Sequence, residues 1–351
     1  MNRKLLMLMT VGLGATAWLS SCQNDDEPQP QAAQREIHLG SSVGDVTRSN
    51  DATNLLNGDT CYVWTDMVNP STTPATVTEY FNAWALKANG VGGLSTLAAG
   101  NAKLFPATNM LNFYALVGNF GKKTVEEEQV PRITDGEDAL PDENGVRHTV
   151  LDDQTTAEAY YKSDLMYAVK LEQEPVSDAV ILPFKHLLSR IQVVLVAGNR
   201  METTGLTGAT VELLNLTRQV NITPTRGEQT ATLSTPQSAD AGNILMSTSV
   251  VSAASDATAQ NSTVYADAIV VPQTIATGSQ FIRVNYLDRD TYYRIPSGEG
   301  AQPLVLESGK QYRFRLVCDR IGETYELNTV TVEDWGAAGD ALPIWLDTVV
   351  Q

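Results

Sequence analysis

The sequence has 351 residues, more than one ordinary domain needs and enough for two domains that each bury a sizeable core. Its 41 Asp and Glu residues outnumber its 24 Lys and Arg residues, and the formal net charge of −17 argues against nucleic acid or anionic lipid headgroups as partners. Thr, Ser, Ala, Val, Gly and Asn are plentiful and Lys is scarce, a composition that favours an exported, β-rich protein over a helical enzyme.

Residues 1–21 have the form of a targeting segment. Arg3 and Lys4 supply positive charge at the start, and an apolar run then ends in small residues before Cys22. The run is shorter than the ~20 residues that span a bilayer as a helix, so we predict no membrane-spanning helix here. The tetrapeptide LSSC that ends at Cys22 resembles the bacterial lipobox, whose cysteine is acylated and becomes the first residue of a mature lipoprotein. The alternative is an ordinary secretory signal with an incidental cysteine.

The next segment, residues 22–34, continues after the cysteine as a polar stretch with two prolines and almost no apolar side chain. Such a stretch cannot bury enough surface to offset the entropy of ordering it, so we expect a flexible tether. Lipid chains on Cys22 would hold this tether at a membrane by burying their CH₂ groups, without a spanning segment.

Residues 35–48 predict a first strand that buries one face. Four residues at alternate positions are suited to the core, and they are Ile37, Leu39, Ser41 and Val43. Beyond them, Arg48 stands in a polar stretch where a protease could cut the chain before Ser49. From these local residues alone, the simpler interpretation is a strand that stays in place, with Arg48 solvated at a turn.

Short strands separated by turn signals are predicted for most of the remaining chain. Alternating apolar residues and many β-branched and aromatic side chains predict strands at residues 61–65, 77–86, 111–117, 163–171, 180–195, 209–216, 231–234, 265–272, 281–295 and 309–318. Pairs of glycine, asparagine, aspartate and proline between them have turn chemistry. No stretch predicts a long helix.

Two of these segments give more detailed predictions. Residues 281–295 are predicted as a hairpin that turns at Asp288-Arg289-Asp290. The buried face of this hairpin should consist of Ile282, Val284 and Tyr286. Residues 309–318 are predicted to turn Arg313 and Arg315 away from a core face. That core face should consist of Tyr312, Phe314, Leu316 and Cys318.

No residue pattern points to catalysis. His38, His148 and His186 are far apart in the sequence and lack metal-ligand spacing, and no nucleophile or phosphate-loop motif is present. The sequence therefore predicts a protein that is not an enzyme and that has no metal or other cofactor. Cys61 and Cys318 alternate with core residues and are predicted as small buried side chains, with a disulfide as the less favoured alternative.

The segment 126–153 is polar and acidic and is predicted as a long connection. Its carboxylates at 135–138 and 142–145 invite a calcium interpretation, because hard cations bind clustered oxygens. The spacing does not match an EF-hand loop, so a solvated acidic loop is favoured.

Four short motifs occur in order in the second half of the chain. They are Phe184-x-His186-x-x-Ser189-Arg190-Ile191-x-Val193, Val271-Pro272-Gln273, Gly309-x-x-Tyr312-x-Phe314-x-Leu316 and Val332-Glu333-Asp334-Trp335. Each motif is weak alone, but in this order and behind a lipobox they resemble the C-terminal signature of the fimbrillin family. That family comprises pilus subunits of Bacteroidales, the Mfa-like lipoproteins among them. The resemblance is specific over residues 183–335 and looser over residues 50–180.

The resemblance implies an all-β fold of two tandem transthyretin-like β-sandwiches, exported as a lipoprotein to the outer membrane and the cell surface. The sandwiches correspond to residues 35–178 and 179–335. It also implies that an arginine-specific protease removes the first strand and that subunits join by donor-strand exchange into a pilus that serves adhesion. The matching positions are Cys22 for the lipid and Arg48 for the cleavage. Other pilus subunits, the protease and the membrane are the expected partners.

The last segment, residues 336–351, offers a hinge and a candidate donor strand. Its alternating residues repeat the order of the first strand (Ile, Leu, small hydroxyl, Val) and are Ile344, Leu346, Thr348 and Val350. A groove shaped for one strand could accept the other in the same register, since a one-residue slip would turn the apolar set outward. The alternative is that this tail is the last strand of its own second domain.

Two further function classes stay open at this point. One is a pilus tip adhesin or anchor of the same family, and the sequence does not decide among stalk, tip and anchor or name the adhesive target. The other is a surface glycan-binding lipoprotein, which would expose clustered aromatic side chains. Candidates for such a cluster are Trp64, Trp84, Tyr160 and Tyr161. Aromatic residues in strands belong more often to the core.

Overall fold

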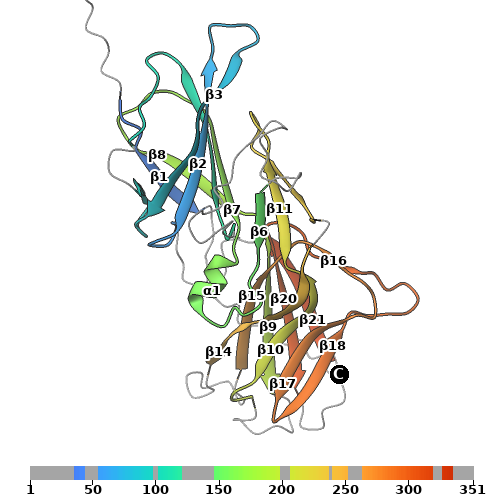
Figure 1. Ribbon diagram of the computed structural model, residues 1–351. Coiled ribbons are helices and arrows are strands. Elements are labelled where there is room, and N and C mark those ends of the chain that lie inside the picture. The colour runs from blue at the N-terminus through green and yellow to red at the C-terminus, as the bar shows by residue number, and fades with distance from the viewer. Residues whose placement is uncertain are drawn as a thin grey trace, which may run out of the picture. The chain divides into compact units, whose positions relative to one another are not determined.

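The computed structural model describes residues 35–43, 54–97, 102–120, 146–197, 206–236, 239–251, 263–318 and 326–334. These residues form an all-β fold of several sheets (Figure 1). Helix α1 (Ala157–Lys162) begins where the Thr156 hydroxyl accepts a hydrogen bond from the Ala159 N–H. Within the described residues, no helix has the length and apolar character needed to cross a bilayer.

Seven strands form a sheet that closes on itself, called here the closed sheet. Its strands are β1 (Leu39–Val43), β2 (Thr60–Asn69), β3 (Thr76–Ala88), β4 (Gly93–Thr96), β5 (Met110–Val117), β7 (Met166–Gln173) and β8 (Val180–His186). They are hydrogen-bonded in the order β1-β4-β3-β2-β5-β7-β8, with β8 next to β1. The strands predicted at residues 61–65, 77–86 and 111–117 lie within β2, β3 and β5, so these predictions are confirmed.

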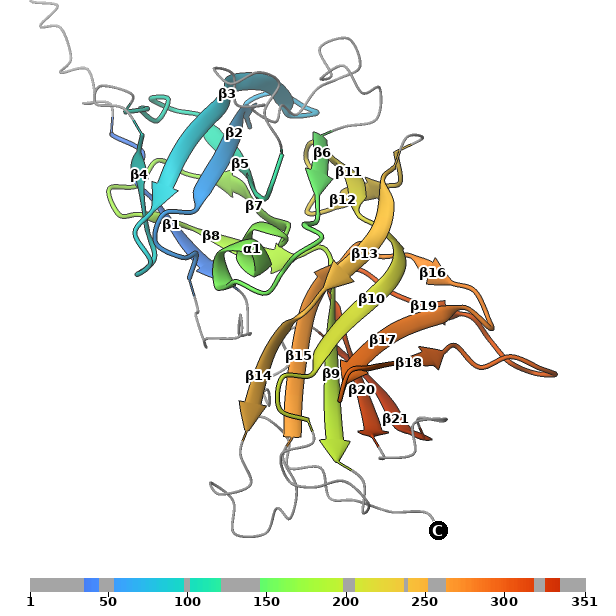
Figure 2. The same ribbon diagram turned by 60° about the horizontal axis from the view of Figure 1, so that its bottom comes forward.

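The rest of the described chain forms four further sheets (Figures 1 and 2). The five-stranded sheet has the order β14 (Ser247–Val251), β15 (Thr263–Val270), β9 (Ser189–Ala197), β20 (Lys310–Cys318) and β21 (Glu326–Asp334). The four-stranded sheet has the order β13 (Ala241–Leu245), β10 (Thr210–Thr217), β17 (Gln280–Tyr286) and β18 (Arg289–Arg294). Two small sheets consist of β12 (Ala231–Ser234), β11 (Gln219–Pro224) and β6 (Val146–Thr149), and of β16 (Thr274–Ile275) and β19 (Leu304–Val305).

Period-two burial explains why these segments form strands. On β20, the predicted core face is buried and consists of Tyr312, Phe314, Leu316 and Cys318. On β17, the predicted buried face is also confirmed and consists of Ile282, Val284 and Tyr286. These residues belong to one large hydrophobic cluster, in which Phe281 and Phe314 pack edge to face. On the opposite face of β20, Arg315 is half-buried and Arg313 is buried.

The hairpin between β17 and β18 turns earlier than the sequence predicts. Tyr286 pairs with Arg289, so the loop consists of Leu287 and Asp288, whose φ angles are 51° and 56°. A two-residue hairpin loop with both central residues at positive φ matches the twist of the strands. The predicted turn at Asp288-Arg289-Asp290 is therefore wrong by one residue. The prediction follows the run of polar residues, whereas the position of the loop is set by the two residues with positive φ.

Sheet membership changes at a different place from the predicted domain boundary. The boundary at residue 178 falls between β7 and β8, which pair directly through Met166 and His186 in the closed sheet. The change to the five-stranded sheet comes between β8 and β9, across Leu187 and Leu188. Pro175 therefore marks a connection within the closed sheet.

Candidate functional site

Strand β1 closes the first sheet between two strands that are far from it in the sequence, β4 and β8 (Figure 2). It runs parallel to β8, with Leu39 opposite Val180 and Val43 opposite Phe184. It runs antiparallel to β4, with Leu39 opposite Leu94. Parallel neighbours need a long connection between them, so this pairing depends on the whole closed sheet and not on a local hairpin.

Main-chain hydrogen bonds hold both ends of the β1 segment. Ahead of the strand, Ile37 N–H donates to the Lys103 carbonyl at 2.8 Å, and Phe105 N–H donates to the Arg35 carbonyl at 2.8 Å. Further along, Ser41 N–H donates to the Gly92 carbonyl at 2.7 Å. On the other edge, Val180 N–H donates to the His38 carbonyl at 2.9 Å. The segment is thus bound through its backbone on both edges, a mode of binding that depends little on side-chain identity.

The four predicted core residues of the first strand all face the interior. Their exposures are 3% for Ile37, Leu39 and Ser41 and 4% for Val43. The three apolar ones join a hydrophobic cluster that also includes Leu55, Cys61, Phe105, Leu182 and Phe184. Burial of an apolar side chain of this size contributes about 1.5–3 kcal/mol, so loss of β1 would expose a costly apolar groove.

Close contacts favour glycine at one position of β1. A Cβ at Gly40 would lie 3.0 Å from the Gly92 carbonyl oxygen and 2.6 Å from Cδ1 of Ile181. The Ile181 side chain is 50% exposed and can move, but the Gly92 backbone is fixed by its hydrogen bond to β1. The role of Gly92 in holding β1 is not visible in the sequence, because the pair Gly92-Gly93 indicates only a turn.

The other predicted site residues lie outside the described residues. They are the lipidation position Cys22, the cleavage position Arg48-Ser49 and the donor-strand residues Ile344, Leu346, Thr348 and Val350. Their roles stay predictions, as does the removal of β1.

Two of the four signature motifs lie where β8 leads into β9 and where β20 begins. Val271-Pro272-Gln273 follows β15, and Val332, Glu333 and Asp334 end β21. Ser189 Oγ donates to the Glu307 carbonyl at 2.8 Å. Gly309 has a φ of 69°, which favours glycine, and its N–H donates to the Leu188 carbonyl at 2.9 Å. Tyr312 Oη donates to the Val305 carbonyl at 2.8 Å, and it accepts a bond from Glu307 N–H at 2.7 Å. These motif residues join the loop before β20 to the start of β9, so their role is structural.

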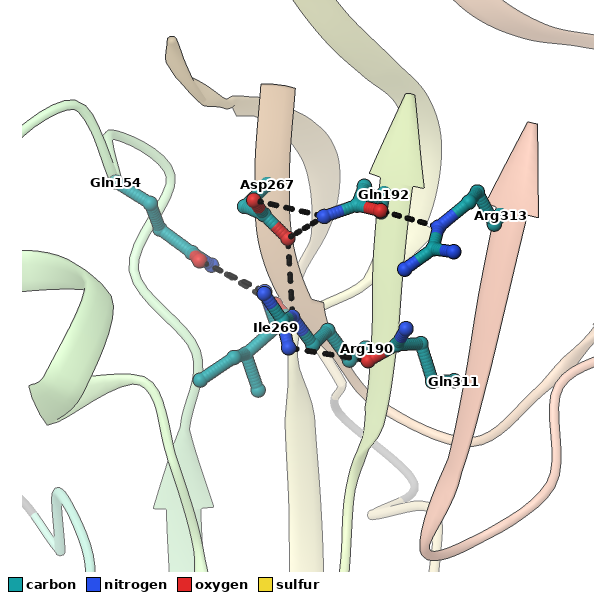
Figure 3. Close-up of polar contacts among 7 residues, drawn as sticks. All are labelled: Gln154, Arg190, Gln192, Asp267, Ile269, Gln311 and Arg313. Carbon is teal, nitrogen blue, oxygen red and sulfur yellow. Dashed lines mark hydrogen bonds and ion pairs between the residues drawn. The ribbon is translucent and has the colours of Figure 1, made fainter. Parts of the chain in front are cut away.

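A row of polar side chains crosses the five-stranded sheet on the face opposite the hydrophobic cluster (Figure 3). This polar row consists of Arg190, Gln192, Asp267, Gln311 and Arg313. Arg190 Nε donates to Asp267 Oδ1 at 3.0 Å, and its Nη1 donates to Gln311 Oε1 at 3.0 Å. Gln192 accepts a bond from Arg313 Nε and lies 3.4 Å from Asp267 Oδ2. The sequence signal was the alternation of these residues on β9, β15 and β20.

Gln154 and Gln273 fix loops against these sheets in a similar way. The Gln154 amide makes two bonds to the Ile269 backbone, at 2.8 and 2.9 Å, across 115 residues of sequence (Figure 3). The Gln273 amide accepts a bond from Thr217 N–H and donates to the Thr217 and Val271 carbonyls. Both amides therefore act as structural links.

The two buried histidines each bind groups of the protein through their rings. His148 Nδ1 accepts a bond from Asn119 N–H, its Nε2 lies 3.0 Å from the Ser163 carbonyl, and burial lowers its pKa to about 4. His186 Nδ1 lies 2.8 Å from Asp164 Oδ2. The two histidines, distant in sequence, thus bind consecutive residues.

Cys61 and Cys318 are buried free thiols, as predicted, and burial raises the pKa of both, that of Cys318 to about 12. A thiol is reactive as its thiolate, so neither side chain is suited to nucleophilic chemistry.

The four aromatic residues proposed as a glycan-binding cluster do not form an exposed patch. Trp64 is 3%, Trp84 6% and Tyr160 5% exposed, and Tyr161 is partly buried. Tyr160 and Tyr161 stack edge to face with ring centroids 5.7 Å apart. These rings pack in the interior, so the four residues do not form a glycan-binding surface.

Comparison with known proteins gives one family match and several structures of similar fold. A family model described as Fimbrillin-like matches residues 47–335. Among curated proteins, no sequence matches. A Bacteroides ovatus structure described as a candidate cell adhesion protein shares 16% identity, over 86% of this chain and 98% of that one, with a TM-score of 0.56. A similarly described Bacteroides uniformis structure shares 18% identity, over 86% and 99%, with a TM-score of 0.53. Both likenesses show a shared fold.

Proposed function

The chain belongs to the fimbrillin-like family, and we propose on this premise that it is a pilus subunit that loses its first strand and polymerises by donor-strand exchange. The family implies a cell-surface protein of pili and adhesion, generally without enzymatic activity. Other pilus subunits are its expected partners. Cys22 would carry lipid and hold the precursor at the outer membrane until cleavage after Arg48.

The observation that carries this proposal is the position of β1. It lies between β4 and β8, and its backbone hydrogen-bonds to neighbours on both sides. Removal of such a strand leaves two rows of unpaired backbone donors and acceptors beside an apolar groove, and a strand from another molecule satisfies both. Cleavage would therefore favour polymerisation.

The tail supplies a strand of matching chemistry. If Ile344 takes the place of Ile37, then Leu346 takes the place of Leu39 and fills the same part of the groove. In that register Asp347 stands where Gly40 stands in β1. Its Cβ would displace the mobile end of Ile181 and would need a shift of a few tenths of an ångström at Gly92. The groove can thus accept the tail with a local adjustment.

We also propose that the fold is a pair of transthyretin-like β-sandwiches behind the tether. The boundary predicted from the sequence lies at residue 178. The pairing of β8 with β1 and β7 argues for a division after β8, at Leu187-Leu188. The first sandwich would then contain the whole groove from which β1 is lost.

The first test is the N-terminal residue of the protein isolated from pili. Mature subunits should begin at Ser49. The Arg48→Ala variant should accumulate as a lipidated monomer, whereas Arg35→Ala, a change at an exposed arginine on the other side of β1, should mature normally. Normal fibres from Arg48→Ala would contradict the cleavage role. Wild-type protein that still begins at lipidated Cys22 would indicate an anchor.

The second test separates the two faces of the tail. Leu346→Asp should give a folded, cleaved monomer that cannot be extended, because an unpaired charge in the groove costs more than the remaining contacts return. Val349→Asp places the same charge on the opposite face and should polymerise. Equal fibre lengths from the two variants in electron micrographs would show that the tail is not the donor strand.

A further inference from the structure

A polar cavity of about 340 Å³, open to solvent on one side, lies beside the four-stranded sheet. Its walls come from β10, from the segment that runs through β16 to the start of β17, and from the end of β18. Figure 2 shows β16, β17 and β18 on the same side of β10. The volume is within the range of about 300–1,000 Å³ that is usual for small-molecule sites.

An irregularity in β10 forms one wall of this cavity. The register of β10 against β13 shifts between Leu213 and Leu216, and Asn215 has a φ of 56°. Its N–H donates to Asn243 Oδ1 at 3.1 Å. Such bulges bend a strand and re-aim side chains, and they are common next to binding sites. Asn215 therefore has no regular pairing partner in β13, and it lines the cavity.

The lining combines an apolar base with polar side chains that are open to solvent, Asn215 and Thr274 being exposed and Ser279 and Gln280 partly buried. Leu214 and Ile275 are each 8% exposed and provide the apolar part. The side chains of Asn215, Thr274, Ser279 and Gln280 make no hydrogen bond with any part of the chain that the structure describes, and all four residues line the cavity. Two amides and two hydroxyls offer both donors and acceptors to a ligand.

Arg294, at the end of β18, is the single ionisable residue in the lining. Its Nη1 donates to the Gly278 carbonyl at 3.4 Å, a long bond that leaves the other guanidinium N–H groups available. No carboxylate lines the cavity, although the chain as a whole carries a net charge of −17. A guanidinium in such a site is suited to a carboxylate, which it can bind with two parallel hydrogen bonds.

We propose that this cavity binds a hexose ring that carries a carboxylate, as in a uronic acid unit of a surface glycan. The carboxylate pairs with Arg294, and the ring hydroxyls bind the amides and hydroxyls of Asn215, Thr274 and Gln280. The C–H face of the ring packs against Leu214 and Ile275. This site uses neither β1 nor the tail, so it goes beyond pilus assembly and would give each subunit an adhesive target.

The test compares three small probes against the full-length protein by isothermal titration and saturation-transfer NMR. D-Glucuronate should bind saturably. D-Glucose, which differs only by CH₂OH in place of the carboxylate, should bind about tenfold more weakly, because it lacks the charge-assisted pair. Acetate should show no saturable binding. Failure of glucuronate to bind, or equal binding of glucuronate and glucose, overturns the proposal, and equal binding of acetate reduces the site to an anion site.

Two variants locate the binding in the cavity. Arg294→Gln should weaken glucuronate binding about tenfold and leave glucose binding unchanged. Arg289→Gln makes the same change on the same strand outside the cavity and should bind like wild type. Asn215→Gly removes the amide while keeping a backbone that tolerates positive φ, and it should weaken both sugars. An equal loss in Arg289→Gln, or no loss in either cavity variant with the fold intact by circular dichroism, contradicts the site.

Discussion

Strand β1 of the closed sheet and strand β9, at the centre of the five-stranded sheet, are held in place by different interactions. β1 is held in the closed sheet by main-chain hydrogen bonds on both edges and by buried side chains such as Leu39. β9 is held in the five-stranded sheet by main-chain pairing and also by the polar row, in which Arg190 binds Asp267 and Gln311. Main-chain pairing accepts any strand with suitable alternation, whereas the polar row accepts only its own partners.

This difference suggests which part of the molecule can exchange a strand. A strand bound by backbone and alternating apolar side chains can be replaced by another of similar pattern. A strand bound by a buried charge network cannot be replaced without leaving a charge unpaired. The closed sheet is therefore suited to exchange of β1 for another strand. The five-stranded sheet should keep β9 in place.

The largest expected effect comes from breaking the polar row. Arg190→Met should lower the free energy of unfolding by about 3 kcal/mol, because it leaves the Asp267 carboxylate without its charged partner on a largely buried face. Arg289→Met removes an exposed arginine and should change stability by less than about 0.5 kcal/mol. Urea denaturation of both variants measures the contrast, and similar losses would remove the distinction drawn between the two sheets.

The second effect is a pH dependence of the free energy of unfolding, which comes from the buried side chain of His148. Burial lowers the pKa of His148 to about 4, so the folded protein keeps this imidazole neutral while the unfolded chain takes up a proton near pH 6.5. The free energy of unfolding therefore carries no penalty from His148 above pH 6.5. As the pH falls from 6.5 towards 4, protonation of this histidine in the unfolded chain lowers the free energy of unfolding by roughly 3 kcal/mol in total.

Denaturation curves between pH 7 and pH 4 measure this loss. His148→Gln should be less stable at pH 7 but should show a shallower decline with falling pH. His38→Gln, at an exposed histidine, should retain the steep wild-type decline. Parallel curves for wild type and His148→Gln would show that another group is responsible.

A smaller effect is expected for conservative changes in β1. Leu39→Met keeps the volume of a buried side chain and should cost less than about 1.5 kcal/mol. Arg190→Lys, which is formally as conservative, loses the fork that binds Asp267 and Gln311 together and should cost more than Leu39→Met. Thermal unfolding of the two variants ranks them, and the reverse order would mean that side-chain identity matters as much in β1 as in β9.

The smallest effect concerns the link between the β20 loop and β9. Ser189→Ala removes the bond from Ser189 Oγ to the Glu307 carbonyl and should cost about 1 kcal/mol. Thr274→Ala, at an exposed hydroxyl outside this link, should cost almost nothing. Equal midpoints in urea would show that the Ser189 hydroxyl is dispensable.

The sequence predicts local structure well where one face is buried and poorly where pairing is distant. The alternation on β17 and β20 identifies core residues such as Val284 and Phe314, and both are fully buried. The pairing of β1 with β8 joins segments about 140 residues apart, and no local pattern encodes it. The same limit applies to Arg313, predicted only to face away from the core, because its burial depends on Gln192 from another strand.

The sequence also leaves part of the candidate site unseen. The alternation of Leu39 and Val43 identifies a strand, but the contact of Gly40 with Gly92 arises only when β4 lies beside β1. The cavity beside β10 depends on the shift in register at Asn215, and a single asparagine in a strand pattern gives no such signal.

The most direct measurement of strand exchange is a disulfide between subunits in assembled pili. In β1, Gly40 is paired with Ile181 and Ser42 with Pro183. If the tail takes the same register, Asp347 lies opposite Ile181, and cysteines at these two positions are at the ~5 Å separation that a disulfide requires. Val349 lies two residues further along and is out of reach of position 181. The native Cys61 and Cys318 are buried and should not interfere.

The account predicts that Ile181→Cys combined with Asp347→Cys gives a ladder of covalent oligomers on non-reducing gels. Ile181→Cys combined with Val349→Cys should give monomers from pili of equal length. No ladder from the first pair, or equal ladders from both pairs, would contradict the replacement of β1 by the tail of a neighbouring subunit in this register.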